Sequence, residues 1–210
     1  MARTGIYALV SGLVVVALLI VSAQFASKEP PPPVLPAGSE GIVIENPPEP
    51  VPQFAFYDQD GKKFTEQAFK GKWSLWFFGY TNCPDVCPTS MMVMNQVAKY
   101  NDLPDTQFVF TSVDPKRDKP AALKEFVTHF NPKFIGTSGE KAEIDKFVET
   151  FGVVYGFEGD TNTDDYVVTH FGAIYIIGPK GVSRAYVLPP HDYKRVLDTY
   201  LLVRNHYEKS

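Results

Sequence analysis

The chain has 210 residues, of which 44% are hydrophobic and 21% are charged, and its formal net charge is −4. This length allows one domain with appendages, and the composition allows that domain to bury a core. No basic stripe is present, which argues against a nucleic-acid-binding protein. The chain has only two cysteines, too few for a dense disulfide framework, so their closeness in sequence indicates local chemistry.

Residues 1–28 are predicted to form an N-terminal transmembrane anchor. The stretch 6–23 contains no charged residue, and as a helix it would span about 27 Å, close to the hydrocarbon thickness of a bilayer. Arg3 precedes the apolar stretch, which favours a cytoplasmic N-terminus and an exported body. We therefore expect a single-pass protein of a bacterial inner membrane, with its soluble domain on the periplasmic side. The alternative is a soluble periplasmic form, exported by a signal peptide that is cleaved near Ala23.

Residues 29–52 are predicted to be a proline-rich linker. Nine of the 18 prolines of the chain lie between positions 30 and 52. Proline has no backbone N–H, so we expect an extended spacer that forms neither a helix nor a strand ladder. A proline-rich recognition motif is the alternative. The folded domain is then expected to occupy residues 53–210.

The pattern of residues 53–210 predicts strands alternating with helices. Asp60-Gly61 is a hairpin-turn dipeptide between two short strands, and the nearly apolar stretch 72–78 is typical of a buried strand. Further strands are expected at 107–113, 134–135, 166–177 and 183–187, and helices at 89–100 and after Asp118, Ser138 and Asp192. This order predicts an α/β, thioredoxin-like sandwich with an extra N-terminal β-hairpin.

Cys83 and Cys87 lie where the first central strand is followed by its helix, at the edge where such sheets bind ligands. Backbone N–H groups at a helix start favour thiolates, which are both nucleophiles and metal ligands. We therefore expect both thiols to ionise readily. The non-functional alternative is an inert structural disulfide, but closing so small a loop would stabilise the fold little.

His170 is the histidine most suited to complete a metal site, because it lies at the mouth of a predicted strand and close to Gly172. A hydrogen-bonded edge histidine is the alternative. We expect His129 and His206 on the surface and His191 at a helix start. Two thiolates and an imidazole form a soft donor set that suits Cu(I), and Cu(II) with an added weak ligand, whereas structural zinc requires a fourth protein ligand.

Two other groups of residues are expected to be structural. Met91, Met92 and Met94 follow the cysteines on the predicted helix and are expected to fill the core rather than bind copper. The segment 160–164 begins like a calcium-binding loop, but Asp165 stands where such a loop needs glycine, so a solvated loop is expected.

The chain resembles the Sco/SenC family of cytochrome c oxidase assembly factors over roughly residues 50–205. The matching stretches are FGYTNCPDVCPT (78–89), SVDPKRD (112–118) and DYVVTHF (165–171). The resemblance implies a copper chaperone for the dinuclear copper (CuA) centre of cytochrome c oxidase subunit II, with Cys83, Cys87 and His170 as copper ligands and Asp114 nearby. Family members commonly carry aspartate before the histidine and a small hydroxyl residue after it, where this chain has Thr169 and Phe171.

Three functions remain open on the sequence. In the first, the protein is a metallochaperone that delivers copper to subunit II, and its other partner is a periplasmic copper donor or a thiol reductant. In the second, it is a thiol–disulfide oxidoreductase whose redox-active pair, Cys83 and Cys87, reduces the cysteines of the copper site; the catalytic residues would then be the same two cysteines. The third is a redox sensor, against which no peroxiredoxin-like Thr-x-x-Cys arrangement is visible.

Overall fold

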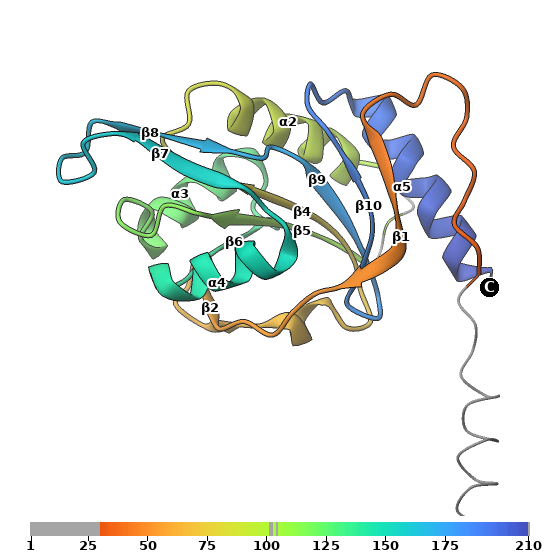
Figure 1. Cartoon of the computed structure of the whole chain (residues 1–210), viewed down its shortest axis with the longest axis horizontal. Helices are drawn as coiled ribbons and strands as arrows, with labels where there is room; N and C mark the ends of the chain where they lie inside the picture. Colours follow the sequence, from red (N-terminus) through yellow and green to blue (C-terminus); the bar gives the residue numbers. More distant parts are fainter. Residues whose placement is uncertain (1–29, 101–102, 104, 210) are drawn as a thin grey trace, which may run out of the picture. The chain divides into compact units, whose positions relative to one another are not determined.

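The computed structural model describes residues 30–100, 103 and 105–209, and Pro32–Lys209 form one compact unit. Figure 1 labels most of the elements of this unit. Its strands are β1 (Ile42–Pro50), β2 (Phe56–Asp58), β3 (Lys63–Phe64), β4 (Trp73–Gly79), β5 (Thr106–Ser112), β6 (Ile135–Ser138), β7 (Tyr155–Gly159), β8 (Tyr166–His170), β9 (Ile174–Gly178) and β10 (Val182–Val187). Its helices are the short 3-10 helix η1 (Glu66–Phe69) and the α-helices α2 (Val86–Ala98), α3 (Pro120–Phe130), α4 (Lys141–Phe151) and α5 (Tyr193–Glu208).

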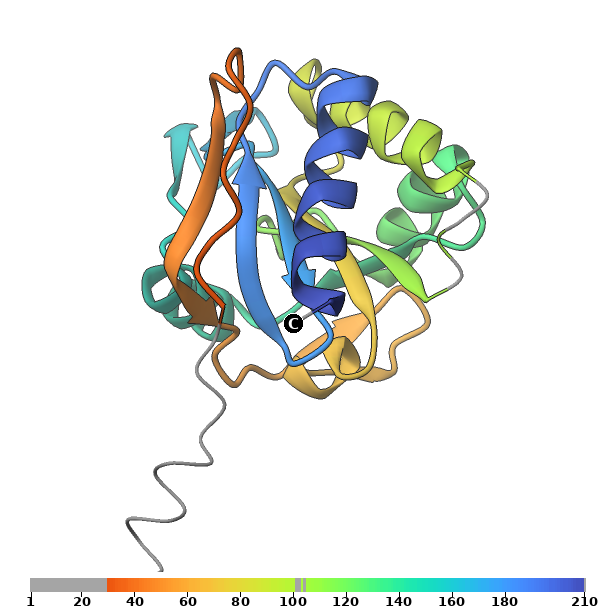
Figure 2. The ribbon, with the colours of Figure 1, turned by 90° about the vertical axis from the view of Figure 1, so that its right-hand side faces the viewer.

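Eight strands form the central sheet, in the order β1-β10-β9-β4-β5-β6-β2-β3. The β4–β5 and β5–β6 pairs are parallel, and the remaining pairs are antiparallel. Helices α2, α3 and α5 lie on one side of this sheet and α4 on the other (Figure 2). The mixed α/β fold is therefore the predicted one, and the N-terminal β2–β3 hairpin is confirmed.

Strand β4 is central because it is buried on both faces, as its apolar sequence predicts. Trp76 faces α4, where its ring centroid lies 5.3 Å from that of Phe147. Phe77 points to the opposite face and lies 6.2 Å from Phe110, which in turn contacts Phe126 of α3 at 4.9 Å. Successive side chains of a strand point to opposite faces, so this one strand joins both halves of the core.

The expectation that the proline-rich segment cannot join a ladder is wrong. Strand β1 pairs antiparallel with β10, from Ile42 opposite Val187 to Pro50 opposite Val182. The register shifts between Ile44 and Glu49, and Pro47 and Pro48 lie in that irregularity. Strand β1 is at the edge of the sheet, and edge strands and bulges are the places where a residue without an N–H is tolerated. The folded unit therefore begins before residue 53.

Two of the residues that were predicted to cap helices do not cap them in the structure. Asp118 and Ser138 are fully buried and cap no helix: α3 is preceded by Lys119 and α4 by Glu140. Asp192 does cap α5, since its Oδ1 accepts a hydrogen bond from the Arg195 N–H at 3.0 Å. Gly152 ends α4 with a φ of 74°, as predicted.

Strand β7 was not expected and pairs with β8 as a two-stranded hairpin outside the central sheet. The loop that joins β7 to β8 contains the segment 160–164, which begins like a calcium-binding loop. There the Asp160 carboxylate accepts hydrogen bonds from the backbone N–H and the side-chain amide of Asn162. These residues are exposed, as expected for a solvated loop.

The predicted anchor at 1–28 lies outside the described residues. Within residues 30–209, apart from the three undescribed positions, no helix is both long and apolar enough to cross a membrane.

Candidate metal centre

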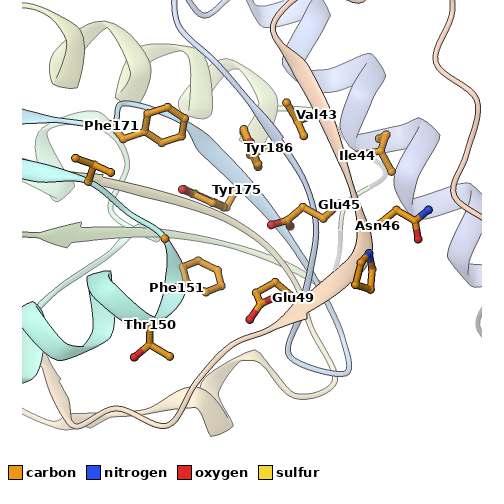
Figure 3. Close-up of a pocket in the computed structure, with 13 residues that line it drawn as sticks. Val43, Ile44, Glu45, Asn46, Glu49, Thr150, Phe151, Phe171, Tyr175 and Tyr186 are labelled. Atoms are coloured by element: carbon orange, nitrogen blue, oxygen red, sulfur yellow. The ribbon is translucent and has the colours of Figure 1, made fainter.

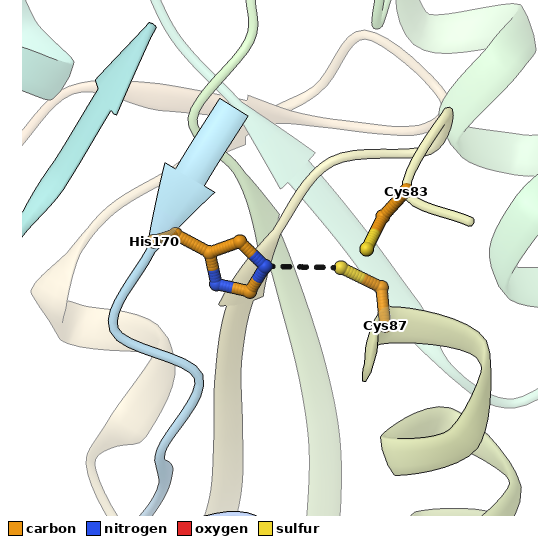
Figure 4. A group of neighbouring side chains, drawn as sticks. All are labelled: Cys83, Cys87 and His170. Carbon is orange, nitrogen blue, oxygen red and sulfur yellow. Dashed lines mark hydrogen bonds between the residues drawn. The ribbon is translucent and has the colours of Figure 1, made fainter. Parts of the chain in front are cut away.

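Cys83, Cys87 and His170 come together at one edge of the fold, although 83 positions separate Cys87 from the histidine (Figure 4). Cys83 lies in the loop after β4, Cys87 in the first turn of α2, and His170 is the last residue of β8. The Cys87 Sγ lies 3.3 Å from the His170 Nε2. The three potential ligand atoms all lie within 4.8 Å of one another. This spacing allows a single ion to contact all three.

The pKa values of the two thiols are shifted in opposite directions. The neighbouring Cys87 thiol, which donates a hydrogen bond to the Cys83 sulfur, and His170 lower the pKa of Cys83 to about 4, although partial burial opposes this. Cys87 is completely buried, and both burial and the adjacent Cys83 thiolate raise its pKa above the ordinary value. The expectation that both thiols ionise readily is therefore wrong for Cys87. Cys83 is the more acidic thiol of the reduced pair.

This difference predicts the pH dependence of the reduced protein. Because the pKa of Cys83 is lowered to about 4, the ultraviolet absorbance of one thiolate should stay constant between about pH 6 and 8 and fall only as the pH approaches that value. Cys83→Ser should remove this absorbance. Cys87→Ala should move its midpoint upward, because the main stabilising partner of the thiolate is then lost. A midpoint above neutral pH in the wild type would contradict the assignment.

Asp118 holds the cysteine loop in place, a role that the sequence did not indicate. One oxygen of its buried carboxylate accepts from the Thr81 hydroxyl at 2.6 Å, and the other from the Thr81 N–H at 2.8 Å and the Ser112 hydroxyl at 2.5 Å. Burial raises the pKa of this carboxyl, while the hydrogen bonds from Ser112 and Thr81 lower it. In the sequence, only the position of Asp118 at the end of the SVDPKRD stretch indicates a role near the site.

Asp114, expected near the metal site, contacts the β7–β8 hairpin that carries His170. Its carboxylate pairs with the Arg117 Nε at 2.5 Å and accepts from the Tyr166 hydroxyl at 2.7 Å. The Arg117 guanidinium lies 3.6 Å from the centroid of the Tyr166 ring and donates to the Tyr166 carbonyl at 3.0 Å. Tyr166 begins β8 and His170 ends it. Asp114 therefore contacts the start of the strand that ends in His170.

Aromatic packing helps to orient the His170 ring, whose Nε2 also contacts the Cys87 Sγ. Phe77 and Tyr80 meet the ring edge to face, with centroids at 5.9 Å and 6.1 Å. The His170 Nδ1 is buried and has no hydrogen-bond partner among the described residues. Thr169 points away, since its side chain is exposed and donates to the Gly156 carbonyl at 3.3 Å. The described residues therefore offer no hydrogen-bond partner of the kind that commonly holds a metal-binding histidine.

The remaining candidates for metal binding stay outside the site. Met91 and Met94 are completely buried, as expected for core residues, whereas Met92 is 56% exposed and fills no core. His129 is exposed, as predicted. His191 precedes α5 and has the Ser90 hydroxyl and the Val187 carbonyl as hydrogen-bond partners, and burial lowers its pKa to about 4. Among the described residues, Cys83, Cys87 and His170 form the one group of three such side chains placed to hold an ion.

Gly79 provides the space for the Cys87 sulfur. A Cβ at this position would lie 2.6 Å from the Cys87 Sγ and 3.1 Å from the Phe110 ring. Gly79→Ala should therefore displace the sulfur, weaken metal binding, and lower the free energy of unfolding by about 1–3 kcal/mol, the usual cost of overpacking. Urea unfolding and a metal titration would measure the two effects.

The matched control is Gly178→Ala. Gly178 ends β9 as Gly79 ends β4, but the nearest atom to its Cβ would lie at 3.5 Å, an ordinary contact. Equal losses in the two variants would show that the close contact with Cys87 is not the cause.

Together, the fold and the site define a thioredoxin-like α/β protein whose two cysteines and one histidine could form a metal site. The family model described as SCO1/SenC matches residues 44–200. The chain belongs to this family.

Known relatives agree with this assignment. The SCO2-like protein RC0895 of Rickettsia conorii is 40% identical over 135 residues, which cover 61% of this chain and 64% of the relative. The chain thus matches just under two thirds of that relative's length. The structure of Bradyrhizobium japonicum ScoI with copper bound is 34% identical, has a TM-score of 0.65, and covers 72% of this chain and 98% of its own. BsSco, described as a member of the Sco family of cytochrome c oxidase assembly proteins with a disulfide switch, is 27% identical at a TM-score of 0.59, covering 76% and 96%.

Proposed function

We propose that this protein binds copper through Cys83, Cys87 and His170 and delivers it to the dinuclear copper centre of cytochrome c oxidase subunit II. The observation that carries the proposal is the convergence of the three ligand atoms within 4.8 Å. Thiolates and imidazole in a set of three suit Cu(I), and a weak added ligand would allow Cu(II). The copper bound to the Bradyrhizobium relative and the oxidase assembly role stated for BsSco support it.

The unequal exposure of the cysteines suits transfer rather than storage. Cys83 is half-buried and Cys87 is completely buried. An incoming thiolate from a partner can therefore reach the ion most easily from the Cys83 side, while Cys87 and His170 still hold it. We expect ligand exchange to begin by replacing Cys83.

Anaerobic titration of the reduced protein with Cu(I) tests the metal site. Wild type should bind one equivalent, and His170→Ala should bind more weakly because one of three ligands is lost. His129→Ala is the matched control and should bind as wild type does, since His129 is exposed and lies outside the site. Copper should then move from wild type to the reduced copper domain of subunit II. Equal affinity of wild type and Cys83→Ser/Cys87→Ser would refute the metal site, and no transfer would refute delivery.

The acidity of Cys83 favours thiol–disulfide exchange as a second function. The Cys83 thiolate would attack a partner disulfide and release one partner thiolate. Cys87 would then lose its proton and attack the Cys83 sulfur, forming the internal disulfide and releasing the second partner thiol. Two electrons thus pass to the partner. If His170→Ala loses copper and oxidase assembly but still reduces such a disulfide, the chaperone role is the one that oxidase assembly needs.

We also propose that residues 1–28 anchor the domain on the periplasmic side of a bacterial inner membrane. The uncharged stretch 6–23 supports this location. After extraction of membranes with carbonate, an anchored protein remains in the membrane fraction at its full mass. A shortened protein in the soluble periplasmic fraction would instead indicate the exported form.

A further inference from the structure

A cavity of about 600 Å³ lies beside β1 (Figure 3), and neither cysteine is among the residues that line it. Its walls come from β1, from the C-terminal end of α4 and from strands β9 and β10. This volume lies in the range of sites that hold a small molecule or a large side chain. Phe171, which directly follows His170, forms part of the wall, and its N–H donates to the Val154 carbonyl at 2.7 Å.

The carboxylates of Glu45 and Glu49, both on β1, line this cavity. The Glu45 Oε2 is buried and has no hydrogen-bond partner among the described residues. Burial raises the pKa of Glu45; the neighbouring Ser183 hydroxyl partly offsets this, and the charge of Glu49 raises the pKa further. No lysine or arginine is among the residues that line the cavity. A bound cation would relieve both the burial and the repulsion of these two carboxylates.

Aromatic rings form another part of the lining. The ring of Tyr175 lies 5.3 Å from that of Phe151 and 5.4 Å from that of Tyr186, and Phe171 lies 5.9 Å from Tyr186. The faces of such rings carry partial negative charge and attract cations, arginine more often than lysine. The cavity therefore combines charge complementarity with flat apolar surfaces.

The C-terminal end of α4 adds a third source of negative charge to the cavity. Thr150, Phe151 and Gly152 line the cavity, and Gly152 is the cap at the C-terminus of this helix. The C-terminal end of a helix carries a partial negative charge. Carboxylates, aromatic faces and a helix end thus all favour a positively charged occupant.

We propose that this cavity binds the guanidinium group of an arginine side chain presented by a partner protein. A guanidinium is flat, stacks on aromatic rings, pairs with carboxylates through two parallel hydrogen bonds and is less strongly hydrated than an ammonium. A bare metal ion would leave most of a cavity of this size unfilled. An arginine bound here would lie against Phe171 and so next to the strand that carries His170.

The test uses the full chain with ¹⁵N-labelled phenylalanine, which reports on the amides of Phe151 and Phe171. N-acetyl-arginine amide should shift both signals and saturate with a Kd on the order of 1 mM, as expected for a single side chain. N-acetyl-citrulline amide has the same shape without the charge and should cause no saturable shift. Equal binding of the citrulline compound or of the matching lysine compound would overturn the proposal, as would the absence of a saturable shift with the arginine compound.

Variants locate the binding. Glu45→Gln and Glu49→Gln should each weaken the arginine compound by roughly tenfold, the effect of losing one charge-assisted hydrogen bond. Glu158→Gln is the matched control, because Glu158 is exposed on β7 and does not line the cavity. Glu49 is exposed, so its variant keeps the test valid even if Glu45→Gln disturbs folding. Unchanged affinity in both variants would refute the site.

Discussion

Replacing Cys87 with serine is expected to abolish copper binding. Its sulfur is completely buried and lies 3.3 Å from the His170 Nε2. Serine replaces a soft sulfur, which can give up its proton to bind copper, with a hard hydroxyl that keeps its proton. The loss of copper affinity should therefore exceed the 10–100-fold that removal of a supporting partner costs. Competition with a chelator of known Cu(I) affinity would measure it.

Buried sulfurs on the same helix provide the control. Met91 and Met94 lie one and two turns after Cys87 and are completely buried. Met91→Leu and Met94→Leu keep the volume of the core and should bind copper as wild type does. A large loss of affinity in either variant, or wild-type affinity in Cys87→Ser, would contradict the ligand assignment.

Arg117→Met is expected to lower the free energy of unfolding by about 3–5 kcal/mol, because it leaves a buried carboxylate without its counter-charge. The side chains of Arg117 and Asp114 are only 9% and 1% exposed. Methionine also gives up the hydrogen bonds that Arg117 donates to the carbonyls of Asp164 and Tyr166, both at 3.0 Å. Urea unfolding would measure the loss as a lower midpoint at an unchanged slope.

The adjacent Lys116 is the matched control. Its ion pair with Asp164 is solvent-exposed, with side chains 46% and 82% exposed, so Lys116→Met should cost about 0–1 kcal/mol. Adding Asp114→Asn to Arg117→Met should recover part of the stability, because the unpaired charge is then removed. If Arg117→Met and Lys116→Met cost the same, the buried ion pair does not stabilise the hairpin as argued.

Several parts of the fold could be predicted because their cause is local. The apolar stretch of β4 needs burial on both faces wherever it lies, and Asp60-Gly61 favours a tight turn in any context. Asp192 and Gly152 act on the backbone of their own helices. Each of these features requires only neighbours in the sequence.

The predictions that were wrong concern features whose cause lies in contacts between residues far apart in the sequence. Proline argued against a strand at β1, but the edge position and the bulge opposite β10 decided otherwise. Asp118 has the residue type of a helix cap, yet burial beside Thr81 and Ser112 gives its carboxylate better hydrogen-bond partners. In both cases, contacts distant in the sequence outweighed the local preference.

The site shows the same division. The sequence by itself determined which residues can bind a soft metal, because cysteine spacing and residue type decide donor chemistry, and Cys83 and Cys87 are joined by a short loop. Only the tertiary structure decided that His170 lies 3.3 Å from Cys87, that the two thiols differ in acidity, and that ring packing holds the histidine. Burial and hydrogen bonding shift a pKa, and both are set by residues that only folding brings together.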